Sequence, residues 1–168
     1  MAALHLICGM ICSGKTYYAA QLCENGAAVP LSLDELTLAV FPEYMGEENA
    51  ARAFDAAKQY LLKKTAQLLD AGCDTVLDWG FWKAAERQSV RAQFEAAGHT
   101  VKLHYLKVTP ACRKQRLAAR EAELAAGGGS YHADEYLLAA RDPLFEEPAA
   151  QERDVMLLDG VRVKLCLP

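Results

Sequence analysis

A glycine-bounded loop near the N-terminus constrains this chain more than any other feature. Residues 9–16 read Gly-Met-Ile-Cys-Ser-Gly-Lys-Thr and match the pattern G-x-x-x-x-G-K-[ST]. In this pattern the backbone N–H groups cradle the phosphates of a nucleotide, and the glycines permit an approach that a Cβ would block. The apolar residues 3–8 predict a preceding strand, and residues from 17 onward predict a helix whose N-terminus would point at the anion. The loop therefore predicts a binding site for a nucleoside triphosphate.

The last residues of the loop have separate expected roles. Lys15 would place a positive charge against the β- and γ-phosphates, and the Thr16 hydroxyl would bind Mg²⁺. The alternative interpretation, a glycine-rich turn with a solvated lysine, is disfavoured by the strand before the loop and the helix after it. The residues expected to contact the nucleotide here are Gly9, Cys12, Ser13, Gly14, Lys15, Thr16 and Tyr17.

Length and charge place further bounds on the chain. Its 168 residues predict a single domain, 1–168, and the formal net charge of −4 gives no general attraction to nucleic acid or an anionic membrane. The six cysteines have neither zinc-finger nor C-x-x-C spacing, and the four histidines occur singly, so we expect reduced thiols and structural or surface histidines. No basic region precedes the first apolar run, which predicts no signal peptide, no transmembrane segment and a cytoplasmic location. No feature of the sequence indicates an obligate protein partner.

Strand and helix signals alternate along the whole chain. This alternation predicts an α/β fold with a mainly parallel sheet that is covered by helices on both faces. The expected strands are 3–8, 27–33, 74–78 and 100–108, with a terminal hairpin of 154–158 and 161–165. The expected helices begin at 17 and span 47–70, 83–97, 110–126 and 133–140, with a short helix that ends at 41–42 and a flexible glycine break at 127–130.

Two aspartates are expected at the carboxyl ends of strands, the edge at which open α/β sheets bind ligands. Asp34 follows the second expected strand and would accept the proton of an acceptor hydroxyl during phosphoryl transfer. Asp78 ends the third expected strand and would hold Mg²⁺ or its water shell. The alternative for each aspartate is to cap the helix or turn that follows it.

An aromatic run follows Asp78 directly and has two interpretations. The sequence there is Trp79-Gly80-Phe81-Trp82. Paired aromatic residues usually belong to a hydrophobic core. The other interpretation is a wall of the acceptor pocket, because the run would lie at the ligand-binding edge of the sheet.

Three arginines share one face of the helix expected at 110–126. Arg113, Arg116 and Arg120 lie at positions i, i+3 and i+7. One interpretation is a solvated charged face. The other is a lid of about residues 111–141 that brings Arg116 and Arg120, ahead of Arg113, onto the transferring phosphate. Arg87 poses the same choice with less support for a role in the site.

These motifs occur in an order that resembles the AAA_33-type P-loop kinase-like proteins. That group is related to polynucleotide 5′-hydroxyl kinases, chloramphenicol phosphotransferase and the zeta toxins. The likeness covers nearly the whole chain, and the phosphate loop is its most specific part. The matching pieces are Gly9-x4-Gly14-Lys15-Thr16, Leu33-Asp34-Glu35, Leu77-Asp78, Glu86-Arg87, Arg116-x3-Arg120 and Phe145-Glu146-x-Pro148.

The resemblance implies a fold and a set of roles. The fold would be a three-layer α/β/α P-loop fold of the nucleotide-kinase type, with a five-stranded parallel core in the order 2-3-1-4-5. Asp34 would be the general base, Arg120 with Arg116 the lid arginines, and Phe145 would lie where the adenine is held. The catalytic residues implied are Lys15, Asp34, Arg116 and Arg120, and the Mg²⁺ residues are Thr16 and Asp78.

The chain departs from these relatives at two positions. Polynucleotide kinases carry an arginine three residues after the base to grip the acceptor's phosphate, and here that residue is Thr37. Cys12 stands where a small residue usually lies between the loop glycines. We therefore expect an ATP- and Mg²⁺-dependent phosphotransferase that acts on a hydroxyl of a small molecule, with nucleic acid disfavoured as the acceptor. The alternatives are a polynucleotide 5′-hydroxyl kinase and a nucleotide-dependent switch without an acceptor.

Overall fold

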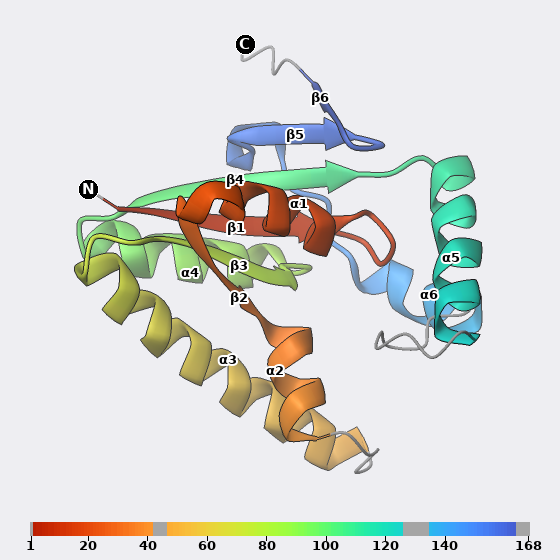
Figure 1. The fold of residues 1–168 in the computed structure, drawn as a ribbon, viewed down its shortest axis with the longest axis horizontal. Helices are drawn as coiled ribbons and strands as arrows, with labels where there is room; N and C mark the ends of the chain where they lie inside the picture. Colours follow the sequence, from red (N-terminus) through yellow and green to blue (C-terminus); the bar gives the residue numbers. More distant parts are fainter. Residues whose placement is uncertain (1, 42–46, 126–134, 164–168) are drawn as a thin grey trace.

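The computed structural model describes residues 2–41, 47–125 and 135–163, and it consists of one six-stranded sheet with helices against both faces (Figure 1). The strands are β1 Ala3–Gly9, β2 Ala28–Ser32, β3 Asp74–Gly80, β4 Thr100–Lys107, β5 Val155–Leu158 and β6 Val161–Val163. The α-helices are α1 Lys15–Cys23, α2 Leu33–Val40, α3 Glu47–Asp70, α4 Ala84–Ala96, α5 Pro110–Ala125 and α6 Glu135–Arg141. Short 3-10 turns are η1 Glu24–Gly26, η2 Asp142–Leu144 and η3 Ala150–Glu152.

The order of the strands in the sheet is β2-β3-β1-β4-β5-β6. All neighbouring pairs are parallel except β5 and β6, which pair antiparallel. The order expected for the first five strands is therefore confirmed, and the second strand of the predicted hairpin extends the sheet by one antiparallel strand at its edge. Because β1 lies between β3 and β4, the loop that follows β1 opens at the middle of the carboxyl edge.

Hydrophobic residues fill both faces of the sheet, which is why the central strands have few polar positions. On one face, Leu4 and Leu6 of β1 pack with residues of α3 and α4, including Leu69 and Phe94. On the other face, Ile7 packs with Ala19 of α1 and with Val76, Leu106, Val155 and Leu157 of the neighbouring strands. Alternate residues of β1 thus serve two cores, and this fixes the register of the strand that leads into the phosphate loop.

The predicted elements agree with the observed ones to within about two residues at their described ends, and the difference that matters for the site is at the end of the third strand. The sequence predicts a strand that stops at Asp78, whereas β3 continues to Gly80. Ile7 pairs with Asp78 and Cys8 pairs with Gly80, so Trp79 is an extra residue that forms a bulge. A bulge bends a strand and changes where its side chains point, and this one lies beside the phosphate loop. The predicted glycine break at 127–130 lies outside the described residues.

Within the described ranges, no helix has the length and apolar character needed to cross a membrane.

Candidate active site

The phosphate loop joins the end of β1 to the start of α1, and close packing explains both of its glycines. A Cβ at Gly9 would lie 2.5 Å from the Ser13 Oγ and 2.7 Å from the Leu106 carbonyl oxygen. A Cβ at Gly14 would lie 2.9 Å from Nη1 of Arg116, and Gly14 has a φ of 93°. A side chain is therefore excluded at Gly9 by the backbone of Leu106, and at Gly14 it is disfavoured mainly by the positive φ, because the Arg116 side chain could move aside.

Lys15 lies at the first position of α1, with its ammonium group turned back over the loop. Its Nζ donates a hydrogen bond of 2.8 Å to the carbonyl oxygen of Met10. Burial lowers the pKa of Lys15, whereas the carboxylates of Asp78 and Asp34 favour its charged form. The structure thus brings one cation and two carboxylates together at the mouth of the loop.

Asp78 is buried, with 5% of its surface exposed, at the carboxyl end of β3. Its carboxylate accepts a hydrogen bond from the Thr16 hydroxyl. Burial raises the pKa of Asp78, and the bond to Thr16 and the charge of Lys15 oppose this rise. The bond to Thr16 shows that Asp78 faces the phosphate loop, so capping of the turn after β3 does not explain its position.

The pair formed by Thr16 and Asp78 fits Mg²⁺ by its chemistry. Mg²⁺ prefers oxygen ligands and is commonly held by one or two carboxylates together with the phosphates of a substrate, rather than by a cage of protein groups. Among the described residues, no three or more His, Cys, Asp or Glu side chains gather into a metal site. One hydroxyl and one carboxylate beside a phosphate loop are consistent with the first kind of site.

Asp34 lies in the first turn of α2, but it is not the residue that caps this helix. The N-cap is Ser32, whose Oγ accepts a hydrogen bond of 3.2 Å from the Glu35 backbone N–H. The Asp34 carboxylate instead shares the electrostatic environment of the phosphate loop. Desolvation raises the pKa of Asp34, Lys15 and Arg120 lower it, and Asp78 raises it.

The first two arginines of α5 donate to backbone carbonyls of the phosphate loop. Arg116 Nη1 lies 2.6 Å from the Ser13 oxygen, and its Nη2 lies 3.1 Å from the oxygen of Asp159 in the β5–β6 turn. Arg113 Nε donates to the Ile11 oxygen at 3.0 Å. The interpretation of this helix face as merely solvated is therefore wrong for Arg113 and Arg116.

Arg120 lies about one turn further along α5 than Arg116. It is close enough to Asp34 for its charge to lower the pKa of that carboxylate. Arg116 contacts the loop beside Gly14, whereas Arg120 acts on the carboxylate of α2. The two arginines expected in the site thus lie at different parts of it.

The aromatic run after Asp78 belongs mainly to the core. Phe81 is fully buried, and Trp79 stacks on it with ring centroids 4.7 Å apart. Trp82 is half-buried and meets Phe145 edge-on at 6.2 Å. Phe145 also stacks on Tyr105 at 6.2 Å, on the sheet face that α3 and α4 cover. Contact of Phe145 with adenine therefore stays a prediction, and the observed contacts of this ring are with the core.

Tyr17 follows Thr16 in the first turn of α1 and is 72% exposed. Its hydroxyl interacts with the Gln21 side chain at 3.4 Å, one turn further along the helix. The ring is thus accessible beside the phosphate loop, and its contact with the nucleotide stays a prediction.

Arg87 proves to be a structural residue. It is 2% exposed and pairs through Nε with Glu152 at 2.9 Å. Its Nη1 donates to the backbone oxygens of Phe81 and Glu146 at 3.0 and 2.9 Å. Arg87 therefore fastens the 145–152 segment to α4, and its position in the sequence carries no signal of the distant partner Glu152.

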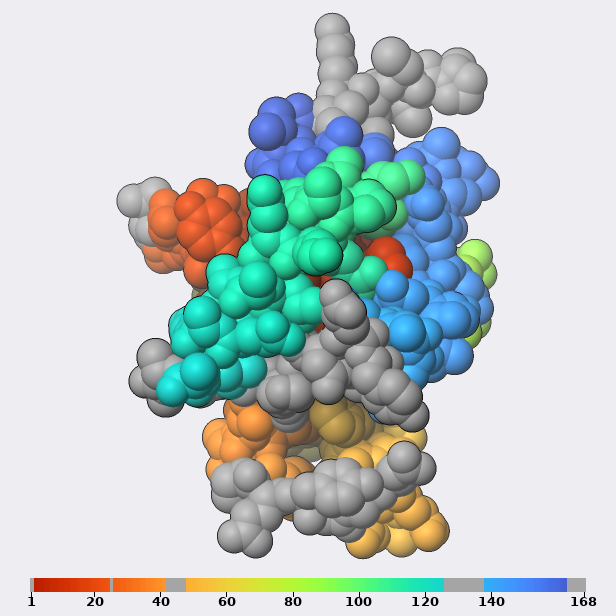
Figure 2. Space-filling model, turned by 90° about the vertical axis from the view of Figure 1, so that its right-hand side faces the viewer, coloured from red at the N-terminus to blue at the C-terminus, as the bar shows by residue number. Residues whose placement is uncertain are grey.

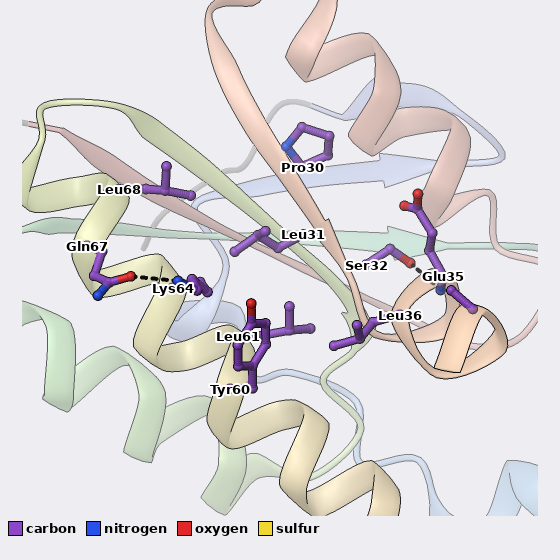
Figure 3. A pocket seen from close by; sticks show the side chains of 11 residues that line it. Pro30, Leu31, Ser32, Glu35, Leu36, Tyr60, Leu61, Lys64, Gln67 and Leu68 are labelled. Atoms are coloured by element: carbon purple, nitrogen blue, oxygen red, sulfur yellow. Dashed lines mark hydrogen bonds between the residues drawn. The ribbon is translucent and has the colours of Figure 1, made fainter. Parts of the chain in front are cut away.

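A groove of about 610 Å³ lies between β2, α2 and α3, and Asp34 is not among the residues that line it (Figure 3). Leu31 of β2, Leu36 of α2 and Leu61 of α3 converge there. Because successive residues are about 100° apart around a helix, Leu36 points to the side of α2 nearly opposite Asp34. A molecule in this groove would be separated by α2 from the phosphate loop.

The fold and these side chains define an ATP-binding domain of the P-loop kinase type. The chain belongs to the AAA_33 family of AAA domains, which its residues 4–139 match. No curated protein matches the sequence.

Solved structures of several kinases share the fold. A sugar kinase of Janibacter sp. HTCC2649 superposes with a TM-score of 0.64 at 16% identity, over 95% of this chain and 86% of that one. The APS kinase CysC of Mycobacterium tuberculosis, solved with AMPPNP and APS, gives 0.64 at 18% identity, over 94% and 88%. A chain of the Pnkp1/Rnl/Hen1 RNA repair complex gives 0.65 at 12% identity, over 85% of this chain but 43% of that one. At these identities the likeness establishes the fold alone.

Proposed function

We propose that this protein transfers the γ-phosphoryl group of Mg-ATP to a hydroxyl of a small-molecule acceptor. One observation carries the proposal: Lys15, Asp78 and Asp34, from three different elements, lie close enough around the phosphate loop to influence each other's ionisation. A site that only bound nucleotide would need the loop and the Mg²⁺ ligands. It would not need a second carboxylate, on a separate helix, facing the same point.

Each group then has a distinct role in the transfer. The backbone N–H groups of residues 9–16 and the Lys15 ammonium bind the phosphates and hold the γ-phosphoryl group in place. Thr16 and Asp78 would hold Mg²⁺, which supplies charge neutralisation on the phosphate oxygens when bound. The Asp34 carboxylate orients the acceptor hydroxyl and accepts its proton as the new oxygen–phosphorus bond forms, while the bond between the γ-phosphorus and its bridging oxygen breaks and ADP leaves.

Arg116 and Arg120 of α5 would have different roles in the site. Arg120, whose charge acts on Asp34, is placed to stabilise negative charge on the transferring group. Arg116, which covers Gly14, is placed to hold the loop and the nucleotide. We propose the whole chain, 1–168, as one kinase domain with a lid of about residues 111–141 that bears these arginines; residues 126–134 of this range lie outside the described residues.

The surroundings of Asp34 favour an acceptor without a phosphate group. Thr37, one turn after Asp34, is 4% exposed, and its hydroxyl donates to the Leu33 backbone oxygen at 2.8 Å. This position faces the protein interior and offers no cation to an acceptor's phosphate. The only cations whose charge affects the pKa of Asp34 among the described residues are Lys15 and Arg120, and both have roles on the transferred phosphate.

The test is ATP consumption by the purified protein with Mg²⁺. The acceptors would be pools of sugars, nucleosides and amino alcohols, with a 5′-hydroxyl oligonucleotide assayed separately. We expect one small-molecule pool to accelerate ADP formation in the wild type and not in Lys15→Ala. Acceleration by the oligonucleotide alone would favour a polynucleotide kinase instead. Nucleotide binding without acceleration by any of a broad set of acceptors would contradict the proposal and favour a switch.

A further inference from the structure

The phosphate loop has a strained residue at its centre. Cys12 has a φ of 62°, in the left-handed region that residues with a Cβ rarely adopt. Such a conformation persists only where the surrounding structure holds it in place. The question is which contacts hold Cys12 there.

The backbone carbonyls on either side of Cys12 are both held by α5. Arg113 Nε donates to the Ile11 oxygen at 3.0 Å, and Arg116 Nη1 donates to the Ser13 oxygen at 2.6 Å. The angle φ of Cys12 is the rotation that turns the peptide group between Ile11 and Cys12. A change of φ to the usual negative range would swing the Ile11 oxygen away from Arg113, so this one bond opposes relaxation of the strained residue.

The same bond sets the direction of an N–H group that faces away from α5. In a planar trans peptide the C=O and N–H bonds point in opposite directions. Because the Ile11 oxygen points at Arg113, the N–H of Cys12 points away from α5. Backbone N–H groups are what a phosphate loop uses to bind its anion, so the conformation of Cys12 bears directly on nucleotide binding.

Arg113 is itself fixed by a paired contact with Asp142. Its Nη1 and Nη2 donate to the two Asp142 oxygens at 2.5 and 2.7 Å, and the two side chains are 13% and 32% exposed. A two-bond pair of this kind fixes the plane of the guanidinium group and leaves its Nε–H in a set direction. In Figure 2, red atoms from the start of the chain are visible between teal α5 and blue atoms of the later part of the chain.

We propose that Arg113, oriented by Asp142, is a positioning residue that keeps the phosphate loop in its nucleotide-binding shape by holding Cys12 in the left-handed conformation. In this role Arg113 contacts neither the phosphates nor the acceptor. The inference depends on nucleotide binding and not on the transfer reaction, so it can fail or stand independently of the proposed kinase activity.

The test is a double-mutant cycle in which Mg-ADP affinity is measured by calorimetry. We expect Arg113→Gln to raise Kd about fivefold or more in the wild-type background. Without the bond from Arg113 to the Ile11 oxygen, nothing on that side holds Cys12 in the left-handed region. Glycine adopts positive φ without penalty, so in the Cys12→Gly background the same change should raise Kd by less than about twofold. Arg113→Lys keeps the positive charge but cannot bind the Ile11 oxygen and both Asp142 oxygens at once. Its Kd should lie between those of the wild type and Arg113→Gln.

Arg91→Gln is the matched control. Arg91 also pairs with an aspartate, Asp154, at 2.7 Å and donates to a backbone oxygen, that of Val101, at 3.0 Å, but it does not touch the loop. We expect this change to lower the melting temperature and leave Kd unaltered. If Arg113→Gln does not fold, the comparison is Cys12→Gly with and without Arg113→Gln, which should bind within about twofold of each other.

Three results would overturn the proposal. One is an equal rise of Kd in the two backgrounds. Another is wild-type affinity in folded Arg113→Gln. The third is a rise in Arg91→Gln as large as that in Arg113→Gln, which would show a general loss of stability.

Discussion

The hydroxyl of Thr16 hydrogen-bonds the carboxylate of Asp78, and this bond joins the first turn of α1 to the carboxyl end of β3. The two residues are 62 positions apart in the sequence, yet β1 and β3 are neighbours in the sheet. The order of the strands therefore brings two oxygen ligands together beside the phosphate loop. Because Asp78 is expected to bind Mg²⁺ and not the nucleotide itself, loss of its carboxylate should weaken Mg²⁺ binding more than nucleotide binding.

We expect Asp78→Asn to abolish most of the gain in ATP affinity that Mg²⁺ provides. Removing a carboxylate at a metal site typically weakens metal binding by about 10-fold or more. The measurement is ATP affinity with Mg²⁺ and with EDTA, and only the Mg²⁺ value should fall. Asp74→Asn, at the opposite end of the same strand, is the control, because Asp74 there accepts from the Ala3 N–H at 2.7 Å. Equal losses with Mg²⁺ and with EDTA would mean that Asp78 serves only the fold.

Asp34 should titrate above the usual range of an aspartate, because desolvation and the nearby Asp78 carboxylate raise its pKa. Carboxyl carbon NMR of the labelled protein, assigned with Asp34→Asn, measures this value directly and needs no acceptor. Once an acceptor is known, its phosphorylation should fall as pH decreases through that pKa, since only the ionised carboxylate accepts a proton. Glu35→Gln, on the neighbouring residue that lines the separate groove, should leave the profile unaltered.

The raised pKa of Asp34 also affects stability. The effect of pH has the opposite sign to that of an ion-paired aspartate, whose pKa is lowered. A carboxyl whose pKa is raised in the folded state binds its proton more tightly there than in the unfolded state. Its contribution to the free energy of unfolding therefore falls as pH rises from the unfolded-state pKa to the folded-state pKa. Asp34→Asn removes this contribution. Its melting temperature at pH 7 should equal or exceed that of the wild type, and a large decrease would show that the carboxylate supports the fold.

Arg87→Met should be strongly destabilising. It removes a cation that is 2% exposed and leaves Glu152 and two backbone oxygens without their donor. Because the Glu152 side chain is 21% exposed and its carboxylate can be solvated, the main cost is that of the backbone oxygens left unpaired, about 1–3 kcal/mol for each buried group. Urea unfolding would measure this, with Lys107→Gln as the control, because Lys107 and Glu147 form an exposed pair, with 45% and 44% of their side chains accessible, worth less than about 1 kcal/mol. A cost for Arg87→Met no larger than the control's would contradict the structural role assigned to Arg87.

Local patterns in the sequence predict most of the fold. The phosphate loop, the alternating strands and helices and the terminal hairpin are all encoded by neighbouring residues, and α3 has the predicted bounds of 47–70. Lys15, Thr16, Asp34 and Asp78 could be selected because each has a fixed place relative to a strand end. The bulge at Trp79 could not be predicted, because it depends on how β3 pairs with β1.

Contacts between distant residues could not be predicted in the same way. The pairs Arg113–Asp142 and Arg87–Glu152 join residues 29 and 65 positions apart. Helical spacing placed Arg113, Arg116 and Arg120 on one face, but it gave no indication that the first two would bind the loop's own backbone. The partner of a long charged side chain depends on how whole elements pack, and no residue pattern along α4 or α5 contains that information.

A cluster of two histidines and a tyrosine under α1 should make the protein sensitive to acid. His104 of β4 lies 2.8 Å from His5 of β1 and 2.9 Å from the hydroxyl of Tyr18 on α1. Burial, with a smaller effect of His5, lowers the pKa of His104 to about 3. The unfolded chain therefore takes up a proton that the folded protein does not, so stability falls as pH decreases from about 6.5 toward 3, by up to about 1.4 kcal/mol per pH unit for one histidine.

The pKa of His5 is lowered as well, mainly by burial, so the double variant His5→Gln/His104→Gln should show a flatter slope of unfolding free energy against pH in this window. Tyr18→Phe keeps both imidazoles and loses one hydrogen bond, so it should lower stability by about 1 kcal/mol at every pH and retain the wild-type slope. A slope unchanged in the double variant would place the acid sensitivity elsewhere.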